Sequence, residues 1–169
     1  MAGLPGAGKS TIARELAERL GGTVLDKDKI RAALFAPADI EYSTAQDDFV
    51  MDVVLRVASY LLRRDLARYI FIDGRPFSRR YQVEQAINCA KEAGADWRII
   101  ECVCSEETAR KRLEQSSGES THPAQNRTFE MYLHVKAEFE PITFLKTVIE
   151  TDRPLDDCVQ MAIAAVRTS

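Results

Sequence analysis

The sequence predicts an α/β fold in which helices cover both faces of a parallel sheet. Strand-like apolar runs are separated from one another by helical patterns, and they occur at residues 22–25, 69–72, 97–103 and 147–149. This alternation is typical of parallel sheets, because the return to the next parallel strand normally passes through a helix. With 169 residues, 46% of them hydrophobic, the chain can bury one core, so we expect a single domain over residues 1–169.

The spacing of apolar residues predicts the helices between these runs. They are expected at residues 9–20, 44–64, 79–93, 106–115, 128–138 and 155–166. The first carries Ile12 and Leu16 on one side and charged residues on the other, which is typical of a helix that covers a sheet. The second follows Ser43, which together with Gln46 fits a capping box.

A glycine-rich loop stands directly before the first predicted helix. Residues 3–10 read G-L-P-G-A-G-K-S and match the Walker A pattern G-x-x-x-x-G-K-[ST]. Glycines permit positive φ, so successive backbone N–H groups converge on phosphate oxygens, and the helix N-terminus adds its partial positive charge. In this geometry Lys9 reaches the β and γ phosphates, and the Ser10 hydroxyl binds Mg²⁺. We therefore expect ATP and Mg²⁺ as cofactors, with the nucleotide bound by Gly3, Pro5, Gly6, Ala7, Gly8, Lys9, Ser10 and Thr11.

The strand that normally leads into such a loop is almost absent from the sequence. Only Met1 and Ala2 precede Gly3. Either the polypeptide starts earlier or the fold tolerates a clipped strand, and the sequence leaves both alternatives open. Counting this strand with the four runs, we expect a five-stranded parallel sheet.

Other segments narrow the class of nucleotide-binding protein. The chain has no N-K-x-D segment of the kind that reads guanine. The run at residues 69–72 leads into Asp73, where a Walker B aspartate stands, but the Glu that a motor ATPase requires does not follow. We assign Asp73 as a second Mg²⁺ ligand and also as a substrate-binding residue. The run Q-S-S-G-E at residues 115–119 is faintly similar to a transporter-ATPase signature, although the chain is too short for that architecture.

Two carboxylates follow the run at residues 22–25, at the strand end where ligands bind in open α/β sheets. Phosphoryl transfer to a hydroxyl needs a base that accepts the proton and aims the nucleophile at the γ-phosphate. We assign this role to Asp28, with Asp26 as the alternative and as a substrate-binding residue. The competing interpretation is that one of the two only caps a helix that begins near Lys29.

Four features resemble those of the small P-loop kinases, a family that includes polynucleotide 5′-kinases, chloramphenicol phosphotransferase and adenylylsulfate kinase. These features are G-L-P-G-A-G-K-S-T at residues 3–11, D-K-D-K-I-R at residues 26–31, S-E-E-T-A-R-K-R-L at residues 105–113, and Asp73. The resemblance implies a three-layer P-loop NTPase fold with a small lid. The D-x-D-x-I-R pattern is particularly similar to adenylylsulfate kinase. Asp28 and Arg31 are similar to the polynucleotide kinases, where the matching Asp is the base, which implies that both residues meet the acceptor.

Arginines are expected to stabilise the charge that spreads over the transferring phosphoryl group, because they stay charged and bind phosphate oxygens bidentately. The resemblance makes Arg112 the ATP-facing, catalytic residue of a lid at about residues 112–127, and Arg110 stands beside it as a second nucleotide contact. The other lid arginine of the polynucleotide kinases falls on Ser116, so we assign its catalytic role to Arg127. The alternative is that all three arginines are solvated charges.

Three further arginines, Arg75, Arg79 and Arg80, follow Asp73 at the same sheet edge. Arg75 and Arg79 stand where family members collect their acceptor, and they could bind an anionic one. The alternative is a surface turn capped by Ser78.

The overall charge argues against nucleic acid as the main partner. The 23 Lys and Arg residues against 26 Asp and Glu residues give a net charge of -3, whereas proteins that grip nucleic acid usually carry a basic excess. We therefore expect a kinase whose partner is a small-molecule hydroxyl acceptor. A polynucleotide 5′-hydroxyl kinase remains a second hypothesis, and a nucleotide-binding regulatory module without transfer activity remains a third.

The sequence also bears on location and assembly. No apolar run approaches the roughly 20 residues of a membrane span, and no basic region precedes an apolar stretch at the N-terminus. These features predict a cytoplasmic protein without a membrane partner. The four cysteines form no C-x-x-C pair, so we interpret them as reduced core residues. The oligomeric state is expected to be a monomer or a homodimer.

Overall fold

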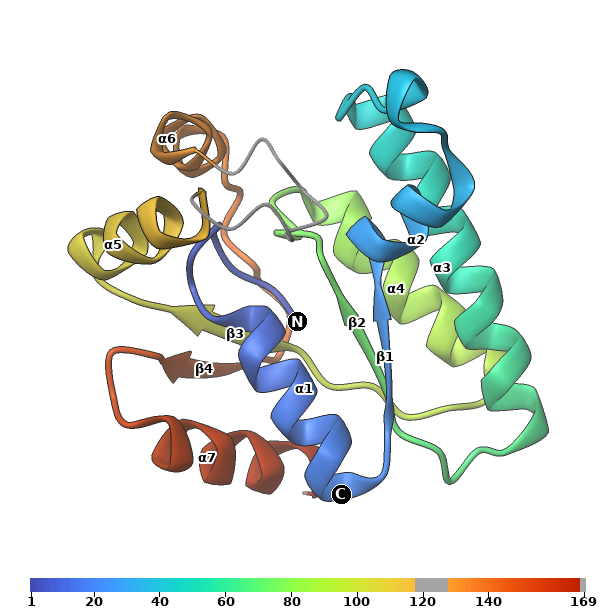
Figure 1. Cartoon of the computed structure of the whole chain (residues 1–169). Helices are drawn as coiled ribbons and strands as arrows, with labels where there is room; N and C mark the ends of the chain where they lie inside the picture. The colour runs from blue at the N-terminus through green and yellow to red at the C-terminus, as the bar shows by residue number, and fades with distance from the viewer. Residues whose placement is uncertain (118–127, 168–169) are drawn as a thin grey trace.

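The structure is a computed structural model, and it describes residues 1–117 and 128–167 (Figure 1). Strands and helices alternate along the described residues, which confirms the predicted α/β class. The strands are β1 (Thr23–Asp26), β2 (Ile70–Asp73), β3 (Ile100–Val103) and β4 (Thr147–Glu150). The α-helices are α1 (Lys9–Leu20), α2 (Lys27–Leu34), α3 (Thr44–Arg64), α4 (Arg80–Ala93), α5 (Glu106–Ser117), α6 (Phe129–Ala137) and α7 (Leu155–Arg167), and a 3-10 helix, η1 (Pro37–Asp39), precedes α3.

The strands form two parallel ladders. β1 pairs with β2, so that Thr23 lies opposite Ile70 and Asp26 lies opposite Asp73. β3 pairs in the same way with β4, from Ile100 opposite Thr147 to Val103 opposite Glu150. Because β4 has only four residues, the paired strand β3 begins at Ile100 and not at residue 97 as predicted. The expected five-stranded sheet is not found as one continuous ladder within the described part of the chain.

The first three residues lie between the two ladders and are hydrogen-bonded to both. The Met1 amine donates to the carbonyl oxygen of Ile72 at 2.9 Å. The Gly3 N–H donates to the carbonyl oxygen of Pro76 at 3.0 Å, just beyond the end of β2. On the other side, Ala2 exchanges two backbone hydrogen bonds with β3, at 2.8 and 2.9 Å. The glycine-rich loop therefore starts at the same sheet edge as the residues that follow β2.

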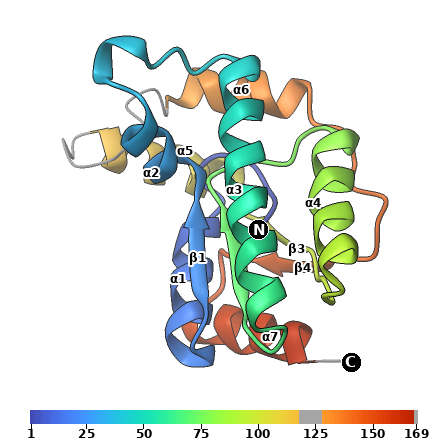
Figure 2. The same ribbon diagram turned by 90° about the vertical axis from the view of Figure 1, so that its right-hand side faces the viewer.

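Helices cover both faces of the strands and complete three layers (Figures 1 and 2). On one face, α1 and α7 pack together through Ile12, Leu16 and Val159, which are at most 1% exposed. On the other face, α3 packs against α4 and buries Val50 and Val54 completely. Burial of each such side chain contributes about 1.5–3 kcal/mol, so the two apolar clusters hold the layers together. The predicted apolar side of the first helix is confirmed.

The start of α3 is fixed by polar contacts. The Ser43 hydroxyl accepts a hydrogen bond from the Gln46 N–H at 3.1 Å, which confirms the predicted cap. The reciprocal half of the capping box does not form, because the Gln46 side chain instead bonds the Glu41 N–H at 3.1 Å and the Asp39 carbonyl oxygen at 2.8 Å. These bonds tie the connection before α3 to the helix and set where its first turn points.

None of the helices in residues 1–117 and 128–167 is long and apolar enough to cross a membrane.

We expect Gly3→Ala to destabilise the fold more than Gly21→Ala. Both glycines have positive φ, 126° and 72°, so each substitution carries a backbone cost of about 1–2 kcal/mol. A Cβ at Gly3 would additionally lie 2.2 Å from the Cys102 carbonyl oxygen, whereas a Cβ at Gly21 meets nothing within 4 Å. Urea unfolding of both variants measures the difference. An equal loss of stability would contradict the tight packing of the loop on β3.

Candidate functional site

The glycine-rich loop connects the first three residues to α1. Gly6 and Gly8 have φ of 77° and 79°, and Gly8 precedes the helix without a side chain that could cap it. Lys9 is the first residue of α1, is 9% exposed, and donates from Nζ to the Leu4 carbonyl oxygen at 2.8 Å. The ammonium group is therefore folded back across the loop. A loop in this geometry presents helix N–H groups and a buried cation to an anion.

Two side chains from distant elements hold the loop from behind. Arg112, on α5, donates to the Gly6 carbonyl oxygen at 3.2 Å, and it also donates to the hydroxyl and the carbonyl oxygen of Thr151, at 2.9 and 2.7 Å. Thr151, directly after β4, donates its hydroxyl to the Ala7 carbonyl oxygen at 3.1 Å. These bonds fix the peptide planes of the loop and place the expected lid arginine in contact with it.

A cavity of about 520 Å³ opens beside this loop, a size that suits a small-molecule ligand. Its lining combines the loop and the start of α1 with Arg112, Thr151, Arg153 and Leu155. Sequence reasoning missed Thr151 and Arg153. The available signal was their position directly after the strand run at residues 147–149, because ligands bind at the carboxyl ends of strands.

A larger cavity of about 730 Å³ lies at the opposite, amino ends of β2 and β3. Its walls include Ile70, Ile99 and Trp97 and are mostly apolar. Since ligands of open α/β sheets bind at the carboxyl ends of the strands, the smaller cavity is the candidate site.

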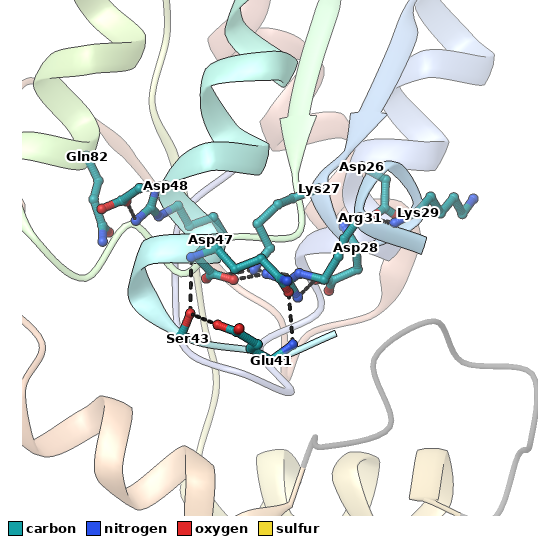
Figure 3. A network of polar contacts seen from close by, with 12 residues as sticks. Asp26, Lys27, Asp28, Lys29, Arg31, Glu41, Ser43, Asp47, Asp48 and Gln82 are labelled. Atoms are coloured by element: carbon teal, nitrogen blue, oxygen red, sulfur yellow. Dashed lines mark hydrogen bonds and ion pairs between the residues drawn. The ribbon is translucent and has the colours of Figure 1, made fainter. Parts of the chain in front are cut away.

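Asp26 and Asp28 occupy different environments after β1 (Figure 3). Asp26 caps α2, because its Oδ1 accepts from the N–H groups of Asp28 at 2.9 Å and Lys29 at 3.3 Å. Asp28 is 5% exposed, and its Oδ1 lies 3.4 Å from Lys27 Nζ and 3.3 Å from Arg31 Nη1. The cap interpretation thus describes Asp26 and explains why α2 begins at Lys27. Asp28 is left as the buried carboxylate of the pair.

The network extends to α3 through a third carboxylate (Figure 3). Asp47 accepts from Lys27 Nζ at 2.8 Å and also forms an ion pair with Arg31. Its neighbour Asp48 pairs with Arg75, a residue that is 2% exposed and lies in the loop after β2. The sequence did not single out these two aspartates.

Asp73 ends β2 directly opposite Asp26 and is 1% exposed. Its Oδ1 has no hydrogen-bond partner among the described residues. A buried carboxylate oxygen without a partner suits a hydrated Mg²⁺, which prefers oxygen ligands and takes several of them from water and from phosphates. No group of three or more Cys, His, Asp or Glu residues in residues 1–117 and 128–167 is arranged to hold a metal by itself. Asp73 and Ser10 would therefore need further ligands for the expected ion, from water and from phosphates.

Some residues proposed from the sequence lie apart from this site. Arg110 stacks over the Phe129 ring, 3.6 Å from its centre, and so joins α5 to α6. Arg79 pairs with Glu138 and Glu140 outside the network after β1 and β2. Arg127, assigned as a second catalytic arginine, lies outside the described residues, as does most of the expected lid.

Burial dominates the electrostatics of the site. It lowers the pKa of Lys27 to about 8, although the adjacent Asp28 carboxylate acts to raise it. Burial also raises the pKa of the Cys102 thiol to about 11, with Lys9 lowering it and Asp73 raising it. Lys9 and Asp73 therefore both lie within electrostatic reach of Cys102, at the centre of the sheet. The thiol itself stays neutral at physiological pH, as expected for a core cysteine.

We expect Lys27 to contribute a rise in stability between pH 8 and about 10.5, the ordinary pKa of lysine. In this window the unfolded chain binds the proton that folded Lys27 has lost, so the Lys27 contribution to the free energy of unfolding increases by on the order of 1 kcal/mol per pH unit. The raised pKa of Cys102 acts in the opposite direction above about pH 9, so the measured quantity is the difference between variants. In urea unfolding at several pH values, the stability of the parent and of Lys29→Met, whose lysine is exposed on the same helix, should change more favourably with rising pH than that of Lys27→Met. The same pH dependence in all three proteins would contradict the lowered pKa of Lys27.

Comparisons with known proteins agree with this architecture. A family model described as "AAA domain" matches residues 1–142. An APS kinase from Mycobacterium tuberculosis, solved with AMPPNP and APS, superimposes with a TM-score of 0.71 at 20% identity, covering 99% of this chain and 95% of that one. A gluconokinase from Sinorhizobium meliloti gives 0.64 at 16% identity, over 98% and 88% of the two chains. A sugar kinase from Janibacter gives 0.64 at 15% identity, over 98% and 91%.

These likenesses concern the fold. They confirm the resemblance to small P-loop kinases that the motifs carry. A comparison with curated protein sequences gave no match.

Proposed function

Because the chain belongs to the AAA domain family, we propose that it is an ATP-dependent kinase that transfers the γ-phosphate to a hydroxyl group of a small molecule. The observation that carries the proposal is the shared position of two groups. The glycine-rich loop begins beside Pro76, and the buried carboxylate of Asp28 follows the strand that pairs with β2. A phosphate cradle and a candidate base thus belong to the same sheet edge, as in-line transfer requires.

On the donor side, the loop and its cavity would hold the nucleotide. Lys9 would turn from the Leu4 carbonyl oxygen to the β and γ phosphates, which are stronger partners for an ammonium group. Arg112 already touches the loop and would face the phosphates from the cavity wall. Mg²⁺, held by Ser10 and Asp73, would supply neutralisation of the charge on the β and γ phosphates. The fold likeness to a kinase solved with AMPPNP supports this side of the proposal.

On the acceptor side, Asp28 would accept the proton of the attacking hydroxyl. Lys27 and Arg31 hold its carboxylate from two directions, so its orientation is set before the acceptor binds. We also infer that the chain acts as one domain in the cytoplasm, as a monomer or homodimer.

We expect Lys9→Ala to lower phosphate transfer by about 100-fold or more, because a cation aimed at the developing charge is lost. The assay is mass spectrometry of an acceptor panel incubated with Mg-ATP, scored for the gain of one phosphate. Lys29→Ala, which removes an exposed lysine nearby, serves as the control and should transfer at the parent rate. A Lys9→Ala protein with parental activity would contradict the assignment of the loop.

Asp28→Asn should lower transfer by about 10²–10⁴-fold while ATP binding, measured by calorimetry, changes little. Asp26→Asn is the matched comparison. It should retain most of the transfer, because Asn also caps helices well and the Asp26 carboxylate is already occupied by α2. The reverse result, with Asp26→Asn inactive and Asp28→Asn active, would assign the role of general base to Asp26 instead.

A further inference from the structure

We propose that Asp47 and Asp48 select an acceptor that is rich in hydroxyl groups and carries no phosphate, sulfate or carboxylate group. The inference rests on the proposed kinase function and adds the charge class of its substrate. It follows from the ion pairs that the buried cations at the carboxyl ends of β1 and β2 already form.

In the part of the chain that the structure describes, the buried cations of α2 and of the loop after β2 are each paired with a carboxylate. Arg31 and Arg75 are both 2% exposed, and they form ion pairs with Asp47 and Asp48 respectively. Lys27, 5% exposed, is bonded to Asp47 at 2.8 Å. An anionic acceptor would have to displace these carboxylates or lie against them, and like charges brought together in a buried site strongly disfavour binding.

The carboxylates are built into the scaffold of α3. The Ser43 cap fixes the first residue of the helix, and it thereby fixes the turn that carries Asp47 and Asp48 (Figure 3). Acidic side chains near a helix N-terminus are also favoured by the helix dipole. The side chains of Asp47 and Asp48 remain 23% and 37% exposed, so a ligand would meet these carboxylates before the cations beneath them.

Aromatic rings enclose the two guanidinium groups further. Tyr42 adopts a left-handed φ of 52° and places its ring centre 5.0 Å from the guanidinium carbon of Arg31. Tyr81 lies 5.9 Å from that of Arg75 and bonds Asp48 through its hydroxyl, at 3.1 and 3.2 Å. Residues held in sparsely populated backbone regions often serve ligand sites, and here the strain keeps a ring against a cation.

The exposed polar atoms that a ligand meets at this edge match a hydroxyl group. The carboxylates of Asp47 and Asp48, which stay partly exposed, are acceptors only. A hydroxyl group can donate its proton to such a carboxylate, whereas an ionised phosphate, sulfate or carboxylate group offers only acceptors.

Sulfate binding tests the masking of the arginines independently of catalysis. The protein is saturated with Mg-AMPPNP to occupy the loop, and inorganic sulfate is titrated at constant ionic strength while the arginine Nε signals are followed by NMR. Arg31→Lys and Arg75→Lys variants assign the two signals. We expect no saturable shift in the parent or in Asp52→Asn, which removes an exposed charge from the same helix. We expect a saturable shift in the double variant Asp47→Asn/Asp48→Asn. Saturable binding of sulfate at Arg31 or Arg75 of the parent would overturn the proposal. The absence of saturable sulfate binding in the double variant would overturn it as well.

Transfer to a matched acceptor panel tests the selection itself. Each polyol is offered as the uncharged form, the amino form, and the carboxylate or sulfate form, with Mg-ATP. The parent is expected to phosphorylate uncharged or amino members, and the double variant should raise their KM at least tenfold with the KM for ATP unchanged. Preference for an anionic member would overturn the inference. If no member gains phosphate, the kinase proposal fails, while the sulfate titration still decides whether the arginines are masked.

Discussion

The site depends on the backbone hydrogen bonds that the first three residues make to both ladders. Met1 and Gly3 bond the β2 side, and Ala2 bonds β3. These bonds hold the two ladders side by side and deliver the glycine-rich loop to their carboxyl edge. Because β1 is in register with β2, the same edge also carries Asp26 opposite Asp73. Main-chain pairing therefore brings the nucleotide loop and the acidic residues to one edge of the strands.

What could be predicted from the sequence was local in character. The loop, the N-terminal cap of α3 and the strand-end position of Asp73 each follow from residues close together in the chain. The contacts between Asp47 and Arg31 or between Thr151 and Ala7 join segments 16 and 144 residues apart, and no local pattern announces them. The arginines of α5 show why such contacts cannot be predicted from the local sequence.

Arg110 and Arg112 are two residues apart, so they point to nearly opposite sides of a helix. Arg112 faces the loop and Arg110 faces Phe129. Which of the two arginines faces the loop depends on how α5 packs against neighbouring elements, and the local sequence does not determine that packing. The split of the sheet into two ladders has the same origin, since it depends on how far the first residues pair with β2 and β3.

The two sides of the site differ in how they are constructed. The loop is held by Arg112 and Thr151 through bonds to the main-chain carbonyl oxygens of Gly6 and Ala7, so these two contacts do not depend on the side chains of the residues that they hold. The acceptor side consists of ion pairs between side chains, in which the cations are buried and the partners Asp47 and Asp48 stay partly exposed. Removal of a carboxylate leaves a buried cation unpaired, so a change of charge at this side costs least stability when both partners change together. A chain with this fold could keep its phosphate cradle while a paired change in α2 and α3 altered the acceptor, so the identity of the acceptor is to be sought in pairs such as Arg31 with Asp47.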